Sequence, residues 1–236
     1  VGAWATTIGL GHLSDVAVRK RLRNTLPWLG RIIGTWLRQR QKGLAGRAVC
    51  VRLIDATVIS EPASRGTDWR VHARFDLGAF SMTGVEITDV SGGETLRRHT
   101  FSEGEIVVAD RGYGHRKGLG AVCAALAYFV VRITWQNLPL ETVDGQRFDP
   151  VRWLRAQSRH PCETSVWATT PAGRVEVRLV AQRLPEHKAE EARRRARKAS
   201  EKKGHTPNKG TLFAAGYILL VTNLPAVSWT TEQVLG

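Results

Sequence analysis

Two aspartates of this 236-residue sequence, Asp55 and Asp110, are the side chains best placed to do chemistry. Each ends a short apolar run, VRLID in the first case and IVVAD in the second. Such runs predict buried strands, and a sheet presents the side chains at the carboxyl ends of its strands to a crevice. Two carboxylates on neighbouring strands repel each other, and a divalent cation relieves that cost. Mg²⁺ prefers carboxylate oxygens together with water and substrate phosphate, so the pair predicts a Mg²⁺ site.

A metal site of this kind suits phosphoryl transfer. Two metal ions about 3.5–4 Å apart activate a water molecule and stabilise the leaving oxygen of an in-line displacement. Three acidic ligands are usual, because two carboxylates leave much of the metal charge uncompensated. The alternative is structural, since an aspartate at the end of a strand commonly caps a turn.

Other chemistries find less support in the sequence. The glycine-rich turn RGYGHRKG places Gly112, Gly114 and Gly118 in a pattern one residue too long for a dinucleotide fingerprint. The chain has no GK[ST] phosphate loop, HExxH pair or GxSxG elbow, and His72 and His115 are not expected to bind zinc. Three cysteines far apart in the sequence favour a reducing compartment over a zinc ribbon or a disulfide framework.

The charge of the chain predicts an anionic partner. Lys and Arg number 35 against 21 Asp and Glu, a formal net charge of +14. Ten basic and no acidic residues lie between Asp15 and Asp55, and a second block over 186–209 holds nine basic and four acidic residues. Two separated basic blocks suggest a polyanion held at more than one place, with salt-dependent binding. The alternative is a set of solvated helix faces on a protein that is merely basic.

The order of elements predicts an α/β fold, a mixed sheet flanked by helices. Residues 1–46 carry apolar side chains at helical spacing and are expected to be helical. Strands are expected over 48–57, 69–77, 80–90, 106–110, 128–134 and 217–224, and a helix over 117–127. In the strand 69–77 the side chains of Arg70, His72 and Arg74 are predicted to face solvent. In its hairpin partner, Val85 and Ile87 are predicted to face the core.

Residues from about 135 to 210 are predicted to form a β-rich insertion that ends in a basic helix over 187–203. Its sequences VDGQ and PAGR are hairpin signals. Thr230, Thr231 and Glu232 then predict a helix N-terminus, with a threonine cap and an early acid. The longest uncharged apolar run, 121–131, falls short of the roughly 20 residues that a membrane span needs.

Three segments, LIDATVISEPASRGTDWRVHARFDL, IVVADRGYGHRKGL and YFVVRI, resemble the core of bacterial insertion-sequence DDE transposases. The similarity is strongest to the IS-four-like, hairpin-forming branch, with its DRGY second motif, and includes the block TLFAAGYILLVTNL. It implies a ribonuclease-H-like core over 47–236 with the insertion inside it, preceded by a DNA-binding segment over 1–46. It also implies catalysis by three carboxylates that bind Mg²⁺ or Mn²⁺, with Asp55 as the first and Asp110 as the second.

The sequence departs from this family at the third acid. In the family that acid is a Glu on a helix after the TNL strand, in a motif with Tyr, Arg, Glu and Lys at helical spacing. The chain contains no such motif, and Glu232 is expected to be only the first-turn acid of a helix. We therefore expect a core that is incomplete at its C-terminus, binds DNA, holds one metal ion at most and cleaves little or not at all.

The function implied by the resemblance is metal-dependent cleavage and transfer of the DNA strands of an insertion sequence. The partners would be double-stranded transposon ends and target DNA, bound by a homodimer in a synaptic complex, in the cytoplasm and at the nucleoid of a bacterium, with no membrane involved. The basic helix is expected to follow the phosphate backbone through Arg193, Arg194, Arg195, Arg197 and Lys198. One alternative is a non-catalytic DNA-binding relic that occupies transposon ends or inhibits a full-length transposase. Another is a metal-dependent nuclease of the same fold.

Overall fold

The computed structural model describes residues 49–60, 66–202 and 204–236, together with isolated positions between 7 and 35. The predicted helical segment 1–46 otherwise lies outside the described residues. Two compact units divide the chain, and the larger one, 49–75 with 82–236, contains both predicted catalytic aspartates and the basic helix.

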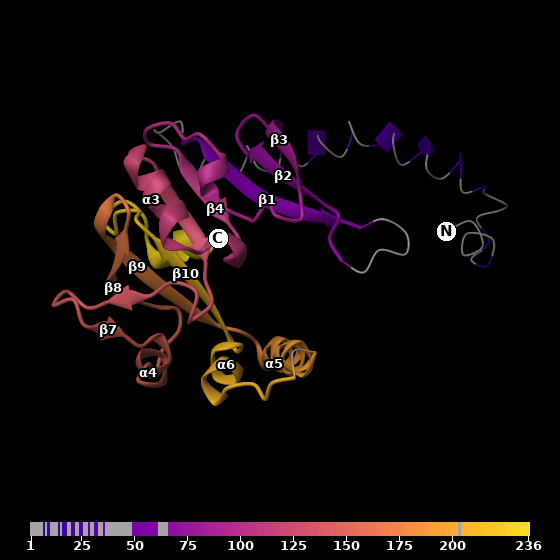
Figure 1. Ribbon diagram of the computed structural model, residues 1–236. Coiled ribbons are helices and arrows are strands. Elements are labelled where there is room, and N and C mark those ends of the chain that lie inside the picture. Colours follow the sequence, from indigo (N-terminus) through magenta and orange to yellow (C-terminus); the bar gives the residue numbers. More distant parts are fainter. Residues whose placement is uncertain are drawn as a thin grey trace. The chain divides into compact units, whose positions relative to one another are not determined.

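Ten strands of the described chain form one mixed sheet (Figure 1). Their spatial order is β3–β2–β1–β4–β5–β10–β9–β8–β6–β7. The strands β1, β4 and β5 are parallel to one another, and β10 runs antiparallel to both β5 and β9. The bounds are β1 Val51–Ile59, β2 Trp69–Asp76, β3 Ser81–Asp89, β4 Ile106–Ala109, β5 Tyr128–Arg132, β6 Leu140–Glu141, β7 Arg147–Phe148, β8 Cys162–Thr170, β9 Gly173–Arg183 and β10 Tyr217–Thr222.

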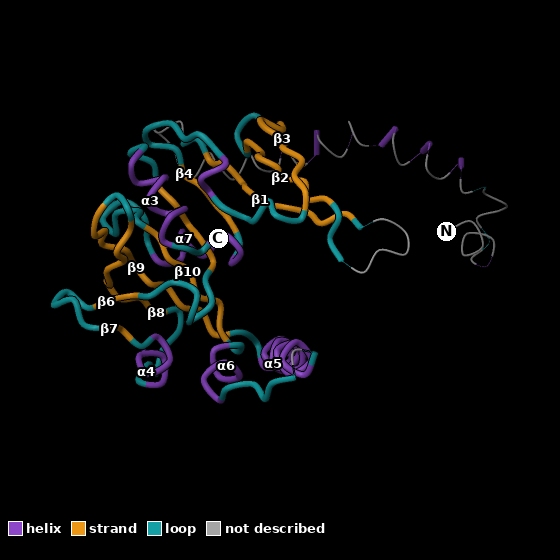
Figure 2. Tube along the Cα trace, in the orientation of Figure 1, coloured by secondary structure: helices purple, strands orange, loops and turns teal. Residues whose placement is uncertain are grey.

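Helices flank the sheet and connect its strands (Figure 2). They are the 3₁₀-helices η2 (Leu96–Arg98) and η3 (Arg111–Tyr113), and the α-helices α3 (Arg116–Ala124), α4 (Pro150–Arg155), α5 (Glu186–Glu201), α6 (Lys209–Ala214) and α7 (Thr231–Leu235). The predicted helix start near the C-terminus is confirmed, because Thr230 caps α7 in a capping box with Gln233 and Glu232 lies in its first turn. None of the described helices is long and apolar enough to cross a membrane.

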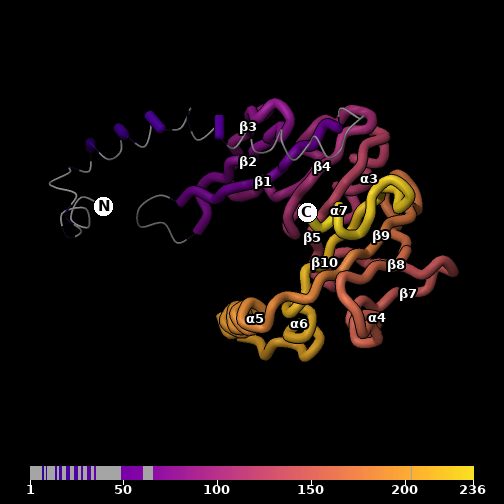
Figure 3. The backbone as a smooth tube through the Cα atoms, turned by 180° about the vertical axis from the view of Figure 1, so that it is seen from behind, coloured from indigo at the N-terminus to yellow at the C-terminus, as the bar shows by residue number. Residues whose placement is uncertain are grey.

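The two faces of the central sheet pack against different elements because neighbouring side chains along a strand alternate between faces. Val107 and Phe129 belong to the larger core cluster, which includes Leu119 and Val122 of α3. The neighbouring Ile106 belongs to a second cluster with apolar side chains of α7 and the turn before it. Figure 3, seen from behind, shows α7 beside β5 and β10.

The predicted mixed α/β fold is confirmed, and the arrangement is compatible with a ribonuclease-H-like fold. Within residues 49–60, 66–202 and 204–236, the expected strands and helices are present, with ends shifted by a few residues. The strands within 135–210 do not form a separate sheet. Instead, β9 pairs with β10 over six residue pairs and β8 continues from β9, so this region extends the central sheet.

Two expectations about the β2–β3 hairpin are wrong. His72, predicted to face solvent, is fully buried, whereas Val85 and Ile87, predicted to face the core, are 60 % and 65 % exposed. The cause is the segment after β3, whose Arg98 and His99 form a cavity with the polar side chains of β2. Alternation alone identifies two faces of a strand but not which of them a later segment covers.

Candidate active site

Asp55 and Asp110 occupy equivalent positions on adjacent parallel strands. The pairing of β1 with β4 aligns Leu53 with Val108 and Ile54 with Ala109. The next residue along each strand is the aspartate, and both aspartates are exposed. Residues that share a register in neighbouring parallel strands direct their side chains to the same face of the sheet. One detail differs from prediction: β1 continues to Ile59, so Asp55 lies within its strand, while Asp110 directly follows the end of β4.

The Asp110 carboxylate also caps the turn that follows it. Its Oδ1 accepts a hydrogen bond of 2.8 Å from the backbone N–H of Gly112, at the start of η3. The alternative prediction, that an aspartate at the end of a strand caps a turn, is therefore confirmed for Asp110. A cap of this kind engages one carboxylate oxygen and leaves capacity for a further ligand.

A third carboxylate, that of Glu94, lies against the same turn. A Cβ atom at position 112 would clash with Glu94 Oε2 and would lie 3.2 Å from Asp110 Oδ1. Gly112 therefore leaves the space in which these two carboxylates approach each other. Arg70 of β2 lies on the other side of Glu94, with its Nε 3.9 Å from Glu94 Oε1, and offsets part of the negative charge.

Tyr113 places a buried hydroxyl next to the acidic residues. The side chain is fully buried, and its Oη has no hydrogen-bond partner among the described residues. Burial raises the pKa of this phenol, and the negative charges of Glu94, Asp55 and Asp110 raise it further. The hydroxyl thus stays protonated and lies within electrostatic reach of three carboxylates.

The donor set of this site fits a hard cation in part. Asp55, Asp110 and Glu94 offer carboxylate oxygens, the ligands that Mg²⁺ and Mn²⁺ accept. Within the described part of the chain, however, no group of three or more His, Cys, Asp or Glu side chains is arranged to hold a metal ion. The geometry therefore supports two adjacent carboxylates that a cation would supplement with water and phosphate oxygens.

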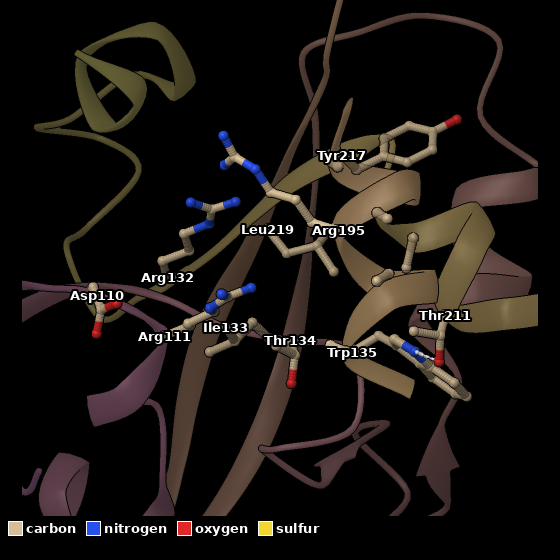
Figure 4. A pocket seen from close by; sticks show the side chains of 15 residues that line it. Asp110, Arg111, Arg132, Ile133, Thr134, Trp135, Arg195, Thr211, Tyr217 and Leu219 are labelled. Carbon is tan, nitrogen blue, oxygen red and sulfur yellow. Dashed lines mark hydrogen bonds between the residues drawn. The ribbon is translucent and has the colours of Figure 1, made fainter. Parts of the chain in front are cut away.

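A cavity of about 470 Å³ opens beside Asp110 (Figure 4). Three arginines line it, Arg111 from η3, Arg132 from the end of β5 and Arg195 from α5. In Figure 4 their head groups extend into the same space, at the end of the cavity where Asp110 lies. Arginine side chains suit phosphate oxygens because the guanidinium presents several donors in a planar fork.

The far wall of the same cavity is apolar. Ala192, Ala196 and Ala199 recur at helical spacing along α5, and small side chains there leave room between the helix and the sheet. Trp135 and Tyr217 add aromatic surface. The Trp135 indole donates a 3.3 Å hydrogen bond to Thr211 Oγ1 of α6, as the dashed line in Figure 4 marks. A charged end next to an aromatic wall matches the chemistry of a nucleotide.

The five basic residues predicted to contact DNA all lie on α5, but they differ in what surrounds them. Arg193 forms ion pairs with Glu186 and Glu190 and is 23 % exposed. Arg195 is 77 % exposed and pairs with Glu191 at 2.5 Å. Arg194, Arg197 and Lys198 are exposed. Arg193 is thus committed to its own helix, whereas the others can meet a ligand.

Several residues at this site were not predicted from the sequence. Glu94 belongs to the turn SGGE and gives no local pattern of its own, and Arg132 ends an ordinary apolar strand. Only the tertiary fold brings these residues close to Asp110. Arg111 and Tyr113 belong to the DRGY motif, which is the sequence signal that could have pointed to them.

The mixed α/β fold thus places two aspartates at equivalent positions of adjacent parallel strands and an arginine-lined cavity beside Asp110, and this arrangement is a candidate site for phosphate chemistry. The chain is 34 % identical, over 99 % of its length, to the "Putative transposase InsL for insertion sequence element IS186A" of Escherichia coli (strain K12). It shows the same identity, over the same share, to the "Transposase for insertion sequence element IS421" of Escherichia coli.

The chain is therefore similar to bacterial insertion-sequence transposases, which confirms that part of the resemblance inferred from its motifs. The DDE type and the DRGY branch stay predictions. It spans 65 % of the length of each of these relatives. No protein-family model matches the chain.

Proposed function

We propose that this chain is the catalytic core of a DNA transposase of the DDE type, which cleaves and joins strands with the help of divalent metal. The observation that carries the proposal is the position of Asp55 and Asp110, which directly follow the paired residues Ile54 and Ala109 of β1 and β4, with Asp110 beside a cavity lined by arginines. Phosphoryl transfer needs little covalent chemistry from the protein. It depends on positioning the phosphate and stabilising its developing charge.

Each residue of the site has a distinct part in this proposal. Asp55 and Asp110 would hold the metal, Mg²⁺ or Mn²⁺, which when bound supplies Lewis-acid stabilisation of the attacking and leaving oxygens. Gly112 keeps Asp110 oriented through its N–H. Glu94 is placed to add a carboxylate on the other side of that turn.

The arginines of the cavity would hold the DNA backbone next to the aspartates. Arg111, Arg132 and Arg195 can each donate hydrogen bonds to a phosphate oxygen, and binding them releases counterions from the DNA. The exposed residues Arg194, Arg197 and Lys198 extend this basic surface along α5. Double-stranded DNA, as transposon end or target, is the partner that we propose, and two copies of the chain would meet on it in a synaptic complex.

The third carboxylate of the family would come from a helix after the last strand of the core. In this chain α7 follows β10, and its first-turn acid Glu232 is exposed. Because the described residues offer no three-ligand cluster, we expect the chain by itself to bind DNA more readily than it cuts. The second candidate is a non-catalytic DNA-binding protein. It fits the same observation, because DNA binding by the basic surface of α5 and the cavity needs neither aspartate.

A comparison of nicking and binding distinguishes the two candidates. We expect the chain to nick supercoiled plasmid slowly in Mn²⁺ and Asp55→Asn to lower that rate by about 100-fold or more, with duplex affinity nearly unchanged. Asp144→Asn, which removes an exposed carboxylate from the β6–β7 turn, is the matched control and should behave as wild type. Binding without any nicking would favour the non-catalytic candidate. Nicking that Asp55→Asn leaves intact would refute the proposed site.

A further inference from the structure

A second cavity, of about 240 Å³, lies between β2, β3 and the segment around η2. His72 and Arg74 of β2, Glu86 of β3, and Arg98 and His99 of the η2 segment line it. None of these residues lines the cavity beside Asp110. The proposed transposase chemistry does not use it.

Two histidines that line this cavity each have a ring nitrogen with no hydrogen-bond partner in the described part of the chain. His72 is fully buried, and its Nε2 lies 3.1 Å from the Thr88 hydroxyl. Its Nδ1 and the buried Nε2 of His99 have no hydrogen-bond partner among the described residues. A buried polar nitrogen without a partner costs free energy, so two of them on residues that line one cavity indicate a ligand that supplies their missing hydrogen bonds.

The charges around the cavity favour an anion as that ligand. Arg74 is anchored by its Nε to Thr83 Oγ1 at 3.1 Å and by its Nη1 to the Thr100 carbonyl. Arg98 donates to the Gly93 carbonyl at 3.0 Å and to Glu86 at 2.8 Å. Glu86 thus offsets one of the two guanidinium charges, and the other remains. A metal cation would meet net repulsion here, whereas an oxyanion finds fixed donors.

We propose that this cavity binds a phosphate group, held by the Arg74 and Arg98 guanidinium groups and by the free ring nitrogens of His72 and His99. Preorganised arginine and imidazole donors are the groups that recognise phosphate in proteins. The phosphate can belong to a DNA backbone or be free in solution. The proposal goes beyond the transposase function and stands independently of Asp55 and Asp110.

Binding should strengthen as the pH falls. Burial lowers the pKa of both imidazoles. The charges of Arg98 and Arg70 lower the pKa of His72 further, and those of Arg74, His72 and Arg98 lower the pKa of His99 further. Glu86 acts in the opposite direction on both rings, and Glu94 does so on His72. A bound anion reverses the effect of the arginines, so protonation and anion binding favour each other.

Titration with inorganic phosphate, followed through the ring ¹H–¹⁵N signals of the histidines in the full chain, tests the proposal. We expect saturable shifts of the His72 and His99 signals in the wild type. Arg98→Gln should weaken phosphate binding about 10-fold or more, because it removes a charged donor. Arg97→Gln makes the same charge change one residue away, at an exposed position outside the cavity, and should leave binding unchanged.

A loss of binding in Arg98→Gln could also come from damage to the fold. A variant that is expected to bind phosphate more tightly separates the two explanations. Glu86→Gln removes the competing carboxylate and should tighten phosphate binding several-fold. With sulfate, whose own charge is constant over this range, affinity should be higher at pH 5.5 than at pH 8. The absence of saturable shifts in wild type, or equal affinities in wild type, Arg98→Gln and Glu86→Gln, would overturn the proposal.

The source of the phosphate is settled by a second titration with a short DNA duplex. If the duplex shifts the same histidine signals and competes with phosphate, the site holds a backbone phosphate. If phosphate binds equally in the presence of saturating duplex, the site takes a free anion. Loss of nicking in Asp55→Asn would change neither result, so failure here and failure of the proposed transposase activity are separate.

Discussion

Asp55 and Asp110 are the residues that come directly after Ile54 and Ala109, which pair with each other in the adjacent parallel strands β1 and β4. Equal register gives the two carboxylates a common face of the sheet. The repulsion between them is the physical reason to expect a cation, and the arginines around the neighbouring cavity are the physical reason to expect a phosphate.

The close approach of Glu94 and Asp110 depends on the absence of a side chain at position 112. Gly112→Ala should displace the flexible Glu94 carboxylate and so cost less than about 1 kcal/mol of stability, while lowering Mn²⁺ affinity several-fold. Gly93→Ala is the control, because a Cβ at position 93 meets open space. Isothermal titration with Mn²⁺ measures the effect, and equal affinities in the two variants would show that Glu94 is irrelevant to the metal.

The hydroxyl of Tyr113 is buried and has no partner within the described ranges of the chain, so its removal should not destabilise the fold. We expect Tyr113→Phe to unfold in urea with a free energy within about 1 kcal/mol of wild type, or higher. Tyr113→Ala, which empties a fully buried site, should cost about 3–5 kcal/mol. A marked loss of stability in Tyr113→Phe would mean that the hydroxyl donates to a carboxylate, in contradiction to the structure.

The exposed arginines of α5 should account for part of the salt dependence of DNA binding. Replacing Arg194 and Arg195 by Ala should weaken binding and reduce the slope of log affinity against log salt by about 1.8, two phosphate contacts at about 0.9 each. Fluorescence anisotropy with a labelled duplex at several salt concentrations measures it. The double variant Arg152→Ala, Arg159→Ala removes the same charge from exposed positions outside α5 and is the control. An unchanged slope in the α5 variant would count against this helix as a contact.

A buried arginine anchors the segment that leads into α7. Arg178 is 7 % exposed, donates to the carbonyls of Leu224 and Trp229, and pairs with Glu163 at 2.5 Å. Removing one partner of an ion pair in buried surroundings leaves the charge of the other partner without compensation. Arg178→Ala should therefore cost at least about 2 kcal/mol, a value that allows for the partial exposure of Glu163.

Arg183→Ala serves as the control for Arg178→Ala. It lies on the same strand, is 60 % exposed and forms a long ion pair of 3.9 Å with Glu186. We expect it to cost less than about 0.5 kcal/mol in urea unfolding. Equal losses in the two variants would show that the buried contacts of Arg178 contribute nothing to stability.

The same contact predicts how stability depends on acidity. Burial by itself would raise the pKa of Glu163, but hydrogen bonds from Arg178 and Thr231 and the charge of Arg178 outweigh it, so the pKa is lowered. A lowered pKa adds stability that is present above the ordinary Glu value of about 4.3 and is lost as the pH falls through the folded value. Urea unfolding between pH 7 and pH 3 should show a shallower decline for Glu163→Gln. Parallel curves would contradict this.

Local sequence patterns were enough to predict the strands that carry the aspartates, because apolar runs that end in an acid identify buried strands directly. The capped start of α7 was equally local, since Thr230 and Gln233 are three residues apart. The burial of His72 was not local: it depends on a segment some 26 residues later, around Arg98, and alternation in β2 carries no information about that segment. Glu94 was missed for the same reason, because its neighbour Gly112 is remote in sequence.

Whether Asp55 and Asp110 share one cation is tested most directly by Mn²⁺ binding to the full chain, followed by the electron paramagnetic resonance signal of the free ion. Saturable binding that Asp55→Asn and Asp110→Asn each weaken about 10-fold or more, while Asp144→Asn leaves it unchanged, is the predicted result. Mn²⁺ affinity that is the same in all four proteins would contradict the account.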